Sequence, residues 1–460
     1  MKLALVLLLA ACSRPSPLDA PEPAPPSDDL PAQIDAIATT ALADTRVPSA
    51  QIAVVRDGKI LYEHAYGDAR LDPDVPATTA MHYSIGSVSK QFTAAAVLLL
   101  AEDGKLSIDD PVGTYIPNLT DGDRVTIRQI LSHTSGYRDY APQDYIIPAW
   151  LVPTTGDAIL DHFARVPLDF EPGTRWQYSN TNFVLAAEIV EKVSGERLFA
   201  FLKRRVFDKL GMTTVISSDA AHLPASDPEG YFRRANGPAH VSPHEAPGWY
   251  LGAAELAMTA HDLATWDISM IDRTVMTPAS YLAMETEVLL ANGAGTRYGL
   301  GVSVSQRGEH RYITHSGEVG GFIAENDVLP DDGIAVVALT NQDASSAAQQ
   351  IASRVEQLLL ANANPAADKR VRGLLDGLAR GELDRTQLTA NANAYFTDDA
   401  IREYRDALAA AGAITKLTQN SQSQRGGMTY RSYSIACATK SLSLSVFELP
   451  DGTIEQFLID

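Results

Sequence analysis

Cysteine is almost missing from this chain of 460 residues, which contains only Cys12 and Cys437. Two cysteines cannot build the disulfide framework of a small secreted domain or a cysteine-based zinc site. The sequence also has no His-Glu-x-x-His motif, and His310 and His315 lie five apart in a predicted strand, so they point to opposite faces. We therefore expect no metal centre and no cofactor.

Basic residues are scarce as well. Lysine and arginine number 37 against 57 aspartates and glutamates, which gives a formal net charge of −20. A nucleic acid or an anionic membrane surface would require a basic face, so the composition argues against both as partners. Apolar residues make up 45% of the chain, which is enough for a sizeable core. The length favours a large domain plus a small one.

At its N-terminus, the chain lacks an apolar run of the roughly 20 residues that span a bilayer. Residues 1–11 instead combine one lysine, a short apolar stretch and small residues, which is the pattern of an export signal. Leu9-Ala-Ala-Cys12 resembles the lipobox of bacterial lipoproteins, and this implies cleavage before Cys12 and its acylation. A chance cysteine in an ordinary secretory signal is the alternative.

The residues that follow fit an anchored protein. Ser13 after the cysteine resembles an outer-membrane address, so we expect a lipid-anchored protein of the cell envelope that faces the periplasm. Residues 12–31 are rich in proline, alanine and acidic side chains and show no apolar periodicity. Such a composition predicts a disordered tether between the lipid and the folded chain.

The segment from Tyr83 to Leu100 places two reactive side chains at the start of a buried helix. Residues 94–101 are all apolar and a capping glycine follows them, so the pattern predicts a helix buried on all sides. Ser87 and Lys90, three positions apart, lie on one face of its first turn. Lysine can activate a serine as a base if burial lowers the lysine pKa. A capping serine beside a lysine that reaches solvent is the structural alternative.

A polar loop, residues 171–182, offers further candidates directly before the apolar helix 183–193. Tyr178 carries a phenol whose pKa of about 10 would fall beside a lysine ammonium, so that it could share the role of base. Asn180 offers a substrate amide both a donor and an acceptor. His133 ends a short helix, and we interpret it as a structural histidine.

Strand patterns alternate with helices elsewhere in the chain. The run that ends at His315 and Ser316 is followed by Gly317, where a missing side chain leaves room for a substrate backbone. The predicted strands are 50–66 as a pair around an Asp-Gly turn, 311–316, 321–329 and 334–339. The predicted helices around them are 32–45 and 347–360.

Three elements together match a known family pattern: Ser87-Val-Ser-Lys90, Tyr178-Ser-Asn180 and His315-Ser-Gly317. Residues 32–365 resemble the serine β-lactamase and DD-peptidase superfamily, on the branch of class C β-lactamases, DD-carboxypeptidases, D-aminopeptidases and related esterases. The resemblance implies an α+β fold, in which an antiparallel sheet flanked by helices stands beside a helical lobe. The active site would lie in the cleft between them.

The resemblance also implies a role for each matching residue. Ser87 would attack the substrate and form an acyl-enzyme, while Lys90 and Tyr178 transfer protons. The remaining roles are substrate binding by Asn180, His315, Ser316 and Gly317, and an oxyanion hole made by the backbone N–H groups of Ser87 and Glu318.

Three positions depart from the pattern of a site that binds a carboxylate. β-Lactamases of this class usually have lysine where this chain has His315, and Val302-Ser303 stands where DD-carboxypeptidases can carry an arginine. Glu318 replaces a small hydroxyl residue. A small-molecule or peptide acyl substrate, most similar to those of DD-carboxypeptidases and D-aminopeptidases, is expected. An esterase of the same fold and a non-enzymatic cell-envelope protein are the alternatives.

The last part of the chain, residues 366–460, has a different pattern. Two predicted helices, 374–388 and 399–411, precede four predicted strands, 414–423, 428–437, 441–449 and 453–459. We expect a small α+β accessory domain, similar to nuclear-transport-factor-like folds, with no catalytic cluster of its own.

The lipobox generates a direct prediction. We expect Cys12→Ser to move the protein from the membrane fraction to the soluble fraction, because an acyl chain can no longer be attached. Fractionation without detergent, followed by immunoblotting, measures this. A variant that still sediments with membranes would contradict lipid anchoring.

Overall fold

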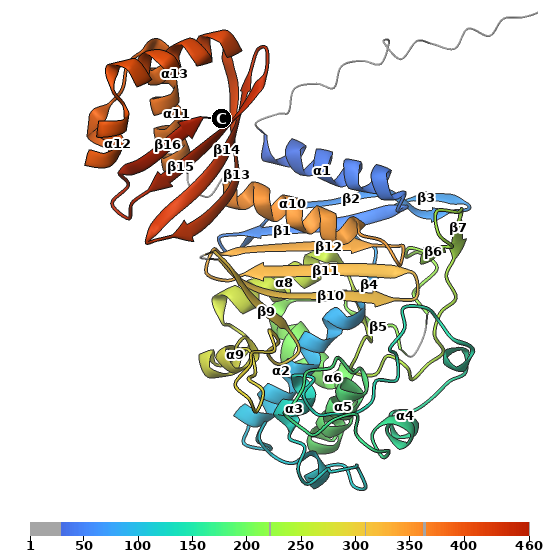
Figure 1. The fold of residues 1–460 in the computed structure, drawn as a ribbon. Helices are drawn as coiled ribbons and strands as arrows, with labels where there is room; N and C mark the ends of the chain where they lie inside the picture. The colour runs from blue at the N-terminus through green and yellow to red at the C-terminus, as the bar shows by residue number, and fades with distance from the viewer. Residues whose placement is uncertain (1–28, 220–221, 309, 362–364, 460) are drawn as a thin grey trace, which may run out of the picture.

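The computed structural model describes residues 29–459 except 220–221, 309 and 362–364. The export signal, Cys12 and nearly all of the predicted tether lie outside the described residues. A seven-stranded antiparallel sheet organises the large domain (Figure 1), in the order β3-β2-β1-β12-β11-β10-β9. Its strands are β1 Ser49–Arg56, β2 Lys59–Leu71, β3 Asp74–Pro76, β9 Ser303–Arg307, β10 His310–Val319, β11 Phe322–Leu329 and β12 Ile334–Thr340.

Helices cover both faces of this sheet. α1 Leu30–Thr45 and α10 Ala347–Ala361 lie on one face, where they share a core with β1 and β12 (Figure 1). α8 Ala260–Asp272 packs on the other face. Because the central strands are covered on both sides, every residue of β12 is buried, which explains its continuous apolar sequence Ile-Ala-Val-Val-Ala-Leu before Thr340.

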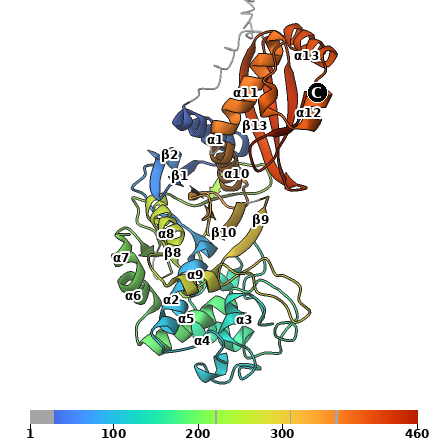
Figure 2. The same ribbon diagram turned by 90° about the vertical axis from the view of Figure 1, so that its left-hand side faces the viewer.

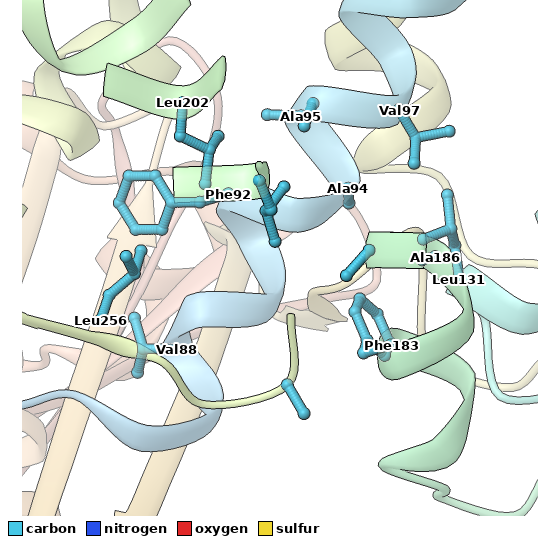
Figure 3. Packing of buried hydrophobic residues seen from close by; sticks show 14 of the residues in the cluster. Val88, Phe92, Ala94, Ala95, Val97, Leu131, Phe183, Ala186, Leu202 and Leu256 are labelled. Atoms are coloured by element: carbon cyan, nitrogen blue, oxygen red, sulfur yellow. The ribbon is translucent and has the colours of Figure 1, made fainter. Parts of the chain in front are cut away.

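The helical lobe is built around α2 Ser89–Glu102, in which every residue from Ser89 to Leu100 is buried. Phe92 packs near Leu202 and Leu256 on one side, and Ala94 and Val97 lie toward α5 Thr181–Ser194 on the other (Figure 3). The predicted all-round burial of this helix is therefore observed. The other helices of the lobe, seen in Figure 2, are α3 Ile127–Leu131, α4 Gly156–Phe163, α6 Leu198–Leu202, α7 Asp208–Leu210 and α9 Pro278–Met284, with a π-helical turn at Lys203–Phe207.

Short elements complete the large domain. β4 Tyr83–Ser84 pairs with β8 Leu256–Met258, which also pairs with β5 Ile216–Ser217. β6 Tyr231–Arg233 pairs with β7 Ala239–Val241. The 3₁₀ turns are η2 Gly86–Val88, η3 Val112–Thr114 and η4 Pro148–Leu151. η2 and α2 follow β4 directly in the chain. The pairing of β4 in this small sheet therefore sets the position of the segment that carries Ser87.

The C-terminal region has its own apolar core. A four-stranded antiparallel sheet packs with three helices, and β13 runs beside α10 (Figure 1). The helices are α11 Pro365–Arg380, α12 Ala390–Tyr395 and α13 Asp398–Ala411, with a 3₁₀ turn at Arg385–Gln387; the strands are β13 Ile414–Arg425, β14 Met428–Cys437, β15 Ser441–Glu448 and β16 Ile454–Ile459.

Several predicted element boundaries are wrong. The second strand of the pair predicted at 50–66 continues to Leu71. The helix predicted at 374–388 begins at Pro365 and ends at Arg380, because Gly381 adopts a left-handed conformation (φ 77°) and stops it. The strand predicted to end at Ser316 continues to Val319, because Gly317 and the two residues after it still pair with β11. The fold class is confirmed.

Other expectations concern features that would be absent. Cys437 is the free cysteine of the described residues. Within the part of the chain that the structure describes, no helix is long and apolar enough to span a membrane. The same residues contain no cluster of three histidine, cysteine or acidic side chains suited to a metal ion.

Two buried carboxyl groups meet between the sheet and α10. Asp327 of β11 is 7% exposed and Glu356 of α10 is 3% exposed, and they hydrogen-bond each other. Burial raises the pKa of both carboxyls, and for Asp327 the hydrogen bond and the charge of Glu356 add to the rise. A carboxyl with a raised folded-state pKa stabilises the fold at low pH, and this stability is lost as the pH rises through that pKa.

We therefore expect Glu356→Gln to raise the melting temperature at pH 8 more than at pH 5, by a difference on the order of a few degrees. The amide of the glutamine is neutral at every pH, whereas the Asp327–Glu356 pair must retain a proton in the folded state. Scanning calorimetry at both pH values measures this. Glu403→Gln, at an exposed position of α13, is the control and should show no such difference. Equal changes at both pH values for Glu356→Gln would contradict the explanation.

Candidate active site

A cleft of about 1050 Å³ lies where the β10 end of the sheet meets the helical lobe. It is lined by Ser87 from η2, by Tyr178 and Asn180 from the loop before α5, and by His315 to Gly320 from β10 and its turn. The loop that follows α3 and the connection from β12 to α10 close its other sides. The structure therefore brings together the residues that the sequence placed in one site.

Two glycines allow the nucleophile turn to approach β10. A Cβ on Gly86, whose φ is 50°, would lie 2.7 Å from the backbone N of Glu318. A Cβ on Gly317 would lie 2.0 Å from the carbonyl oxygen of Ile85 and 2.8 Å from the backbone N of Ser87. No side chain fits between these backbones. The predicted oxyanion donors, the N–H groups of Ser87 and Glu318, consequently lie at one corner of the cleft.

Lys90 is fully buried next to Ser87. Its Nζ donates three hydrogen bonds, to Ser87 Oγ at 2.8 Å, Asn180 Oδ1 at 2.8 Å and the carbonyl oxygen of Ala253 at 2.9 Å. Burial lowers the Lys90 pKa to about 7, although the charge of Asp139 opposes the change. At that pKa a lysine exchanges its proton near neutral pH, which is the property that a general base requires.

Tyr178 lies over the same lysine, with its ring centroid 5.0 Å from Lys90 Nζ. The expectation of a lowered phenol pKa is wrong. Burial raises the Tyr178 pKa above its ordinary value, and a hydrogen bond with Ser87 only partly opposes the rise. The Lys90 charge fails to lower it because the same burial also disfavours the ammonium. Tyr178 is consequently a neutral phenol that can donate a proton or a hydrogen bond at the Ser87 hydroxyl.

Asn180 links Lys90 to a carboxylate that the sequence reasoning missed. Its Oδ1 accepts from Lys90, while its Nδ2 donates to Asp139 Oδ1 at 3.2 Å. The backbone N of Asn180 donates to the same oxygen at 2.8 Å. Asp139 lies 41 residues earlier, so no local spacing indicates the contact. Asn180 Nδ2 also lies 3.4 Å from Asp139 Oδ2, so the amide contacts both oxygens of the carboxylate.

His133 supports the tyrosine from behind. It is fully buried, and its Nδ1 accepts a hydrogen bond from the backbone N of Ser179 at 3.1 Å. Its ring centroid lies 4.2 Å from that of Tyr178 and 4.8 Å from that of Tyr298. Burial and the nearby Lys90 lower the His133 pKa well below its usual value. This neutral ring fits the structural interpretation of His133.

His315 is also held neutral. Burial and the proximity of Lys90 lower its pKa from the ordinary value of a histidine to about 3. Its Nδ1 lies 2.6 Å from the carbonyl oxygen of Ser316, which can only accept, and its Nε2 lies 2.8 Å from the hydroxyl of Tyr298. Nδ1 therefore carries the proton and Nε2 accepts from Tyr298. Neither nitrogen has a hydrogen to offer a substrate carboxylate.

The neighbours of His315 differ in their contacts. Ser316 is exposed to the cleft. The Glu318 side chain lines the cleft and its Oε1 accepts from the backbone N of Ala344 at 2.8 Å. Ser303 pairs with Thr314 at the end of β9.

Negative charge dominates the wall of the cleft. The described residues that line it include no lysine or arginine but six acidic residues, which are Asp139, Asp144, Glu245, Glu318, Glu325 and Asp343. Burial and repulsion from Glu318 and Glu245 raise the Asp343 pKa to about 7. Of these six, the sequence reasoning identified only Glu318, because the others come from separate loops and strands that meet only in the folded chain.

Comparison with known proteins shows which family the chain resembles. The beta-lactamase family model matches residues 34–361. A D-aminopeptidase of Brucella anthropi is 28% identical over 301 residues, which are 64% of this chain and 56% of the relative. The chain thus spans little more than half the length of that relative.

Solved structures give the same result. A D-stereospecific amidohydrolase from Streptomyces sp. is 26% identical with a TM-score of 0.60, over 69% of this chain and 96% of the other. An octameric penicillin-binding protein homologue from Pyrococcus abyssi is 21% identical with a TM-score of 0.60, over 93% of this chain and 99% of the other, and shows likeness of fold alone. The chain belongs to the beta-lactamase family.

Proposed function

We propose that this protein is a serine hydrolase that forms an acyl-enzyme at Ser87 and acts on amide or ester bonds next to D-amino-acid-like acyl groups. The contact that carries the proposal is the 2.8 Å hydrogen bond between Lys90 Nζ and Ser87 Oγ. It joins a hydroxyl at the cleft to a buried amine whose pKa is lowered to about 7. A lysine with a purely structural role would not need to contact the Ser87 hydroxyl or to have a lowered pKa.

The chemistry follows from these groups. Neutral Lys90 takes the Ser87 proton while Oγ attacks the acyl carbonyl, and the two backbone N–H groups of Ser87 and Glu318 stabilise the oxyanion. Lys90 then returns the proton to the leaving amine or alcohol, with Tyr178 as the hydrogen-bonding phenol beside it. In the second half, water gives a proton to Lys90 while its oxygen attacks the acyl carbon. The bond between that carbon and Ser87 Oγ then breaks, the acid leaves, and Lys90 returns the proton to Ser87 Oγ.

The charge of the cleft supports substrates without a carboxylate near the scissile bond. The ionised acidic side chains of the cleft repel such a group, although Glu325 and Asp343, whose pKa values are raised to about 8 and about 7, carry only part of a charge at neutral pH. Neutral His315 offers the group no hydrogen bond. A free ammonium or an uncharged acyl group suits the same wall. This favours a D-aminopeptidase or D-amino-acid amidase over a DD-carboxypeptidase, and the relatives named above support that class.

An esterase of the same fold is the second candidate, because an ester also brings no negative charge to the cleft. A cell-envelope protein without enzymatic activity is disfavoured by the intact contact between Ser87 and Lys90. We further propose that a lipid on Cys12 anchors the protein at the periplasmic face of the outer membrane. Peptides that contain D-amino acids would be accessible to it there.

Replacement of Ser87 tests the nucleophile. We expect Ser87→Ala to abolish hydrolysis and covalent labelling by a fluorophosphonate, because among the described residues the hydroxyl that hydrogen-bonds to Lys90 is that of Ser87. The Ser87 hydroxyl caps neither η2 nor α2, so its removal should leave the variant folded. Mass spectrometry of peptic peptides locates the label. Ser89→Ala is the matched control, since its hydroxyl contacts the backbone N of Leu256 and should leave labelling intact. Turnover by Ser87→Ala would disprove the mechanism.

Selectivity forms a separate test. We expect nitrophenyl esters and D-alanyl amides to be hydrolysed with a higher kcat/KM than nitrocefin or a D-alanyl-D-alanine peptide, because the last two carry carboxylates. All four are measured on one preparation at about pH 7.5. Glu318→Gln removes one repelling charge and should reduce the difference in kcat/KM between the uncharged substrates and those that carry a carboxylate. Nitrocefin as the best substrate by about tenfold, or about 1.4 kcal/mol in barrier, would contradict the argument.

A further inference from the structure

Asp139 occupies a connecting position behind the site. It lies on the loop after α3, and its carboxylate accepts hydrogen bonds from the backbone N of Ala141 at 3.1 Å and of Asn180 at 2.8 Å. A further bond comes from Asn180 Nδ2 at 3.2 Å. Burial raises the Asp139 pKa, and these donors together with the charge of Lys90 oppose the rise by stabilising the carboxylate. No role for such a residue follows from the three sequence elements of the site.

The carboxylate determines how Asn180 is oriented. A carboxylate only accepts hydrogen bonds and an ammonium only donates them, so the amide of Asn180 can satisfy both neighbours in one orientation. Its nitrogen faces Asp139 and its oxygen faces Lys90, with distances of 3.2 Å and 2.8 Å. Rotation of the amide would place two donors against each other at Lys90. Asp139 is therefore connected through Asn180 to the amine that contacts Ser87.

Asp139 also supplies charge where the other neighbours of Lys90 do not. His133 at the end of α3 and His315 on β10 are neutral, because burial and Lys90 itself lower their pKa values. Tyr178, from the loop before α5, is a neutral phenol. Among the described residues, Asp139 is the group whose charge acts to raise the Lys90 pKa.

We propose that Asp139 is a positioning residue of the proton-transfer machinery, which orients Asn180 toward Lys90 and provides the negative charge that keeps Lys90 able to hold a proton during the reaction. This inference rests on the proposed function. Lys90 must accept the Ser87 proton and then deliver it to the leaving group. Without a nearby negative charge, the buried amine would hold that proton too weakly.

The test is the pH dependence of Ser87 activation in Asp139→Asn. Neutral Lys90 is the reactive form, so activity falls as the pH drops below the Lys90 pKa. Loss of the Asp139 charge lowers that pKa further, so the acid limb should move down by about one pH unit. Labelling by a fluorophosphonate and kcat/KM for a nitrophenyl ester, each measured from pH 5 to 9, should show the same displacement. The rate at pH 8 should fall about tenfold, because a weaker base activates Ser87 less.

Two further variants make the result decisive. Asp169→Asn is the matched control: Asp169 bonds to Arg138 and Gln177, next to the same two segments, and its replacement should leave the midpoint unchanged. Asp139→Ser retains an acceptor for the backbone and should reproduce the displacement. Unchanged midpoints in both folded Asp139 variants, or failure of both to fold, would assign Asp139 a structural role and overturn the proposal. Absence of Ser87 labelling in the native protein would instead refute the proposed function.

Discussion

The removal of one ammonium group from water is the constraint on which this structure depends. Lys90 has no exposed surface, and a charged amine in that position would be very unfavourable without partners. Three acceptors, from Ser87, Asn180 and Ala253, offset part of the cost, and the lowered pKa accounts for the rest. Because α2 is enclosed on every side, water cannot reach the amine from behind. The core of the lobe therefore sets the reactivity of the site.

A close contact between the backbone of the Ser87 turn and that of β10 is the second feature that determines the shape of the cleft. Gly86 and Gly317 leave space that any Cβ would fill, so the turn that carries Ser87 lies directly against β10. This contact joins the helical lobe to the sheet and brings two backbone N–H groups beside the nucleophile. The large antiparallel sheet, held between α1 and α10 on one face and α8 on the other, makes β10 a rigid wall for that purpose.

Charge separates the site into two parts with different tasks. Neutral groups, His133, His315 and Tyr178, lie around Lys90, and Asp139 is connected to it through Asn180. The other acidic side chains line the outer cleft. The inner part lets the amine exchange a proton, and the outer part discourages anionic substrates. None of the described residues that line the cleft comes from 365–459. The position of the C-terminal region beside α10 places that region on the far face of the sheet (Figure 1).

The sequence by itself determined the elements whose signals are local. Helical spacing placed Ser87 and Lys90 on one face, an unbroken apolar run indicated a buried helix, and three short motifs indicated the family. It misplaced the end of α11 because the stop is a single left-handed glycine, Gly381, within a pattern that otherwise continues. Only the tertiary structure decided the contact of Asp139 with Asn180, the strongly lowered pKa of His315 and the raised pKa of Tyr178. Each of these depends on burial and on partners far apart in the chain, and neither quantity is written in any local stretch of residues.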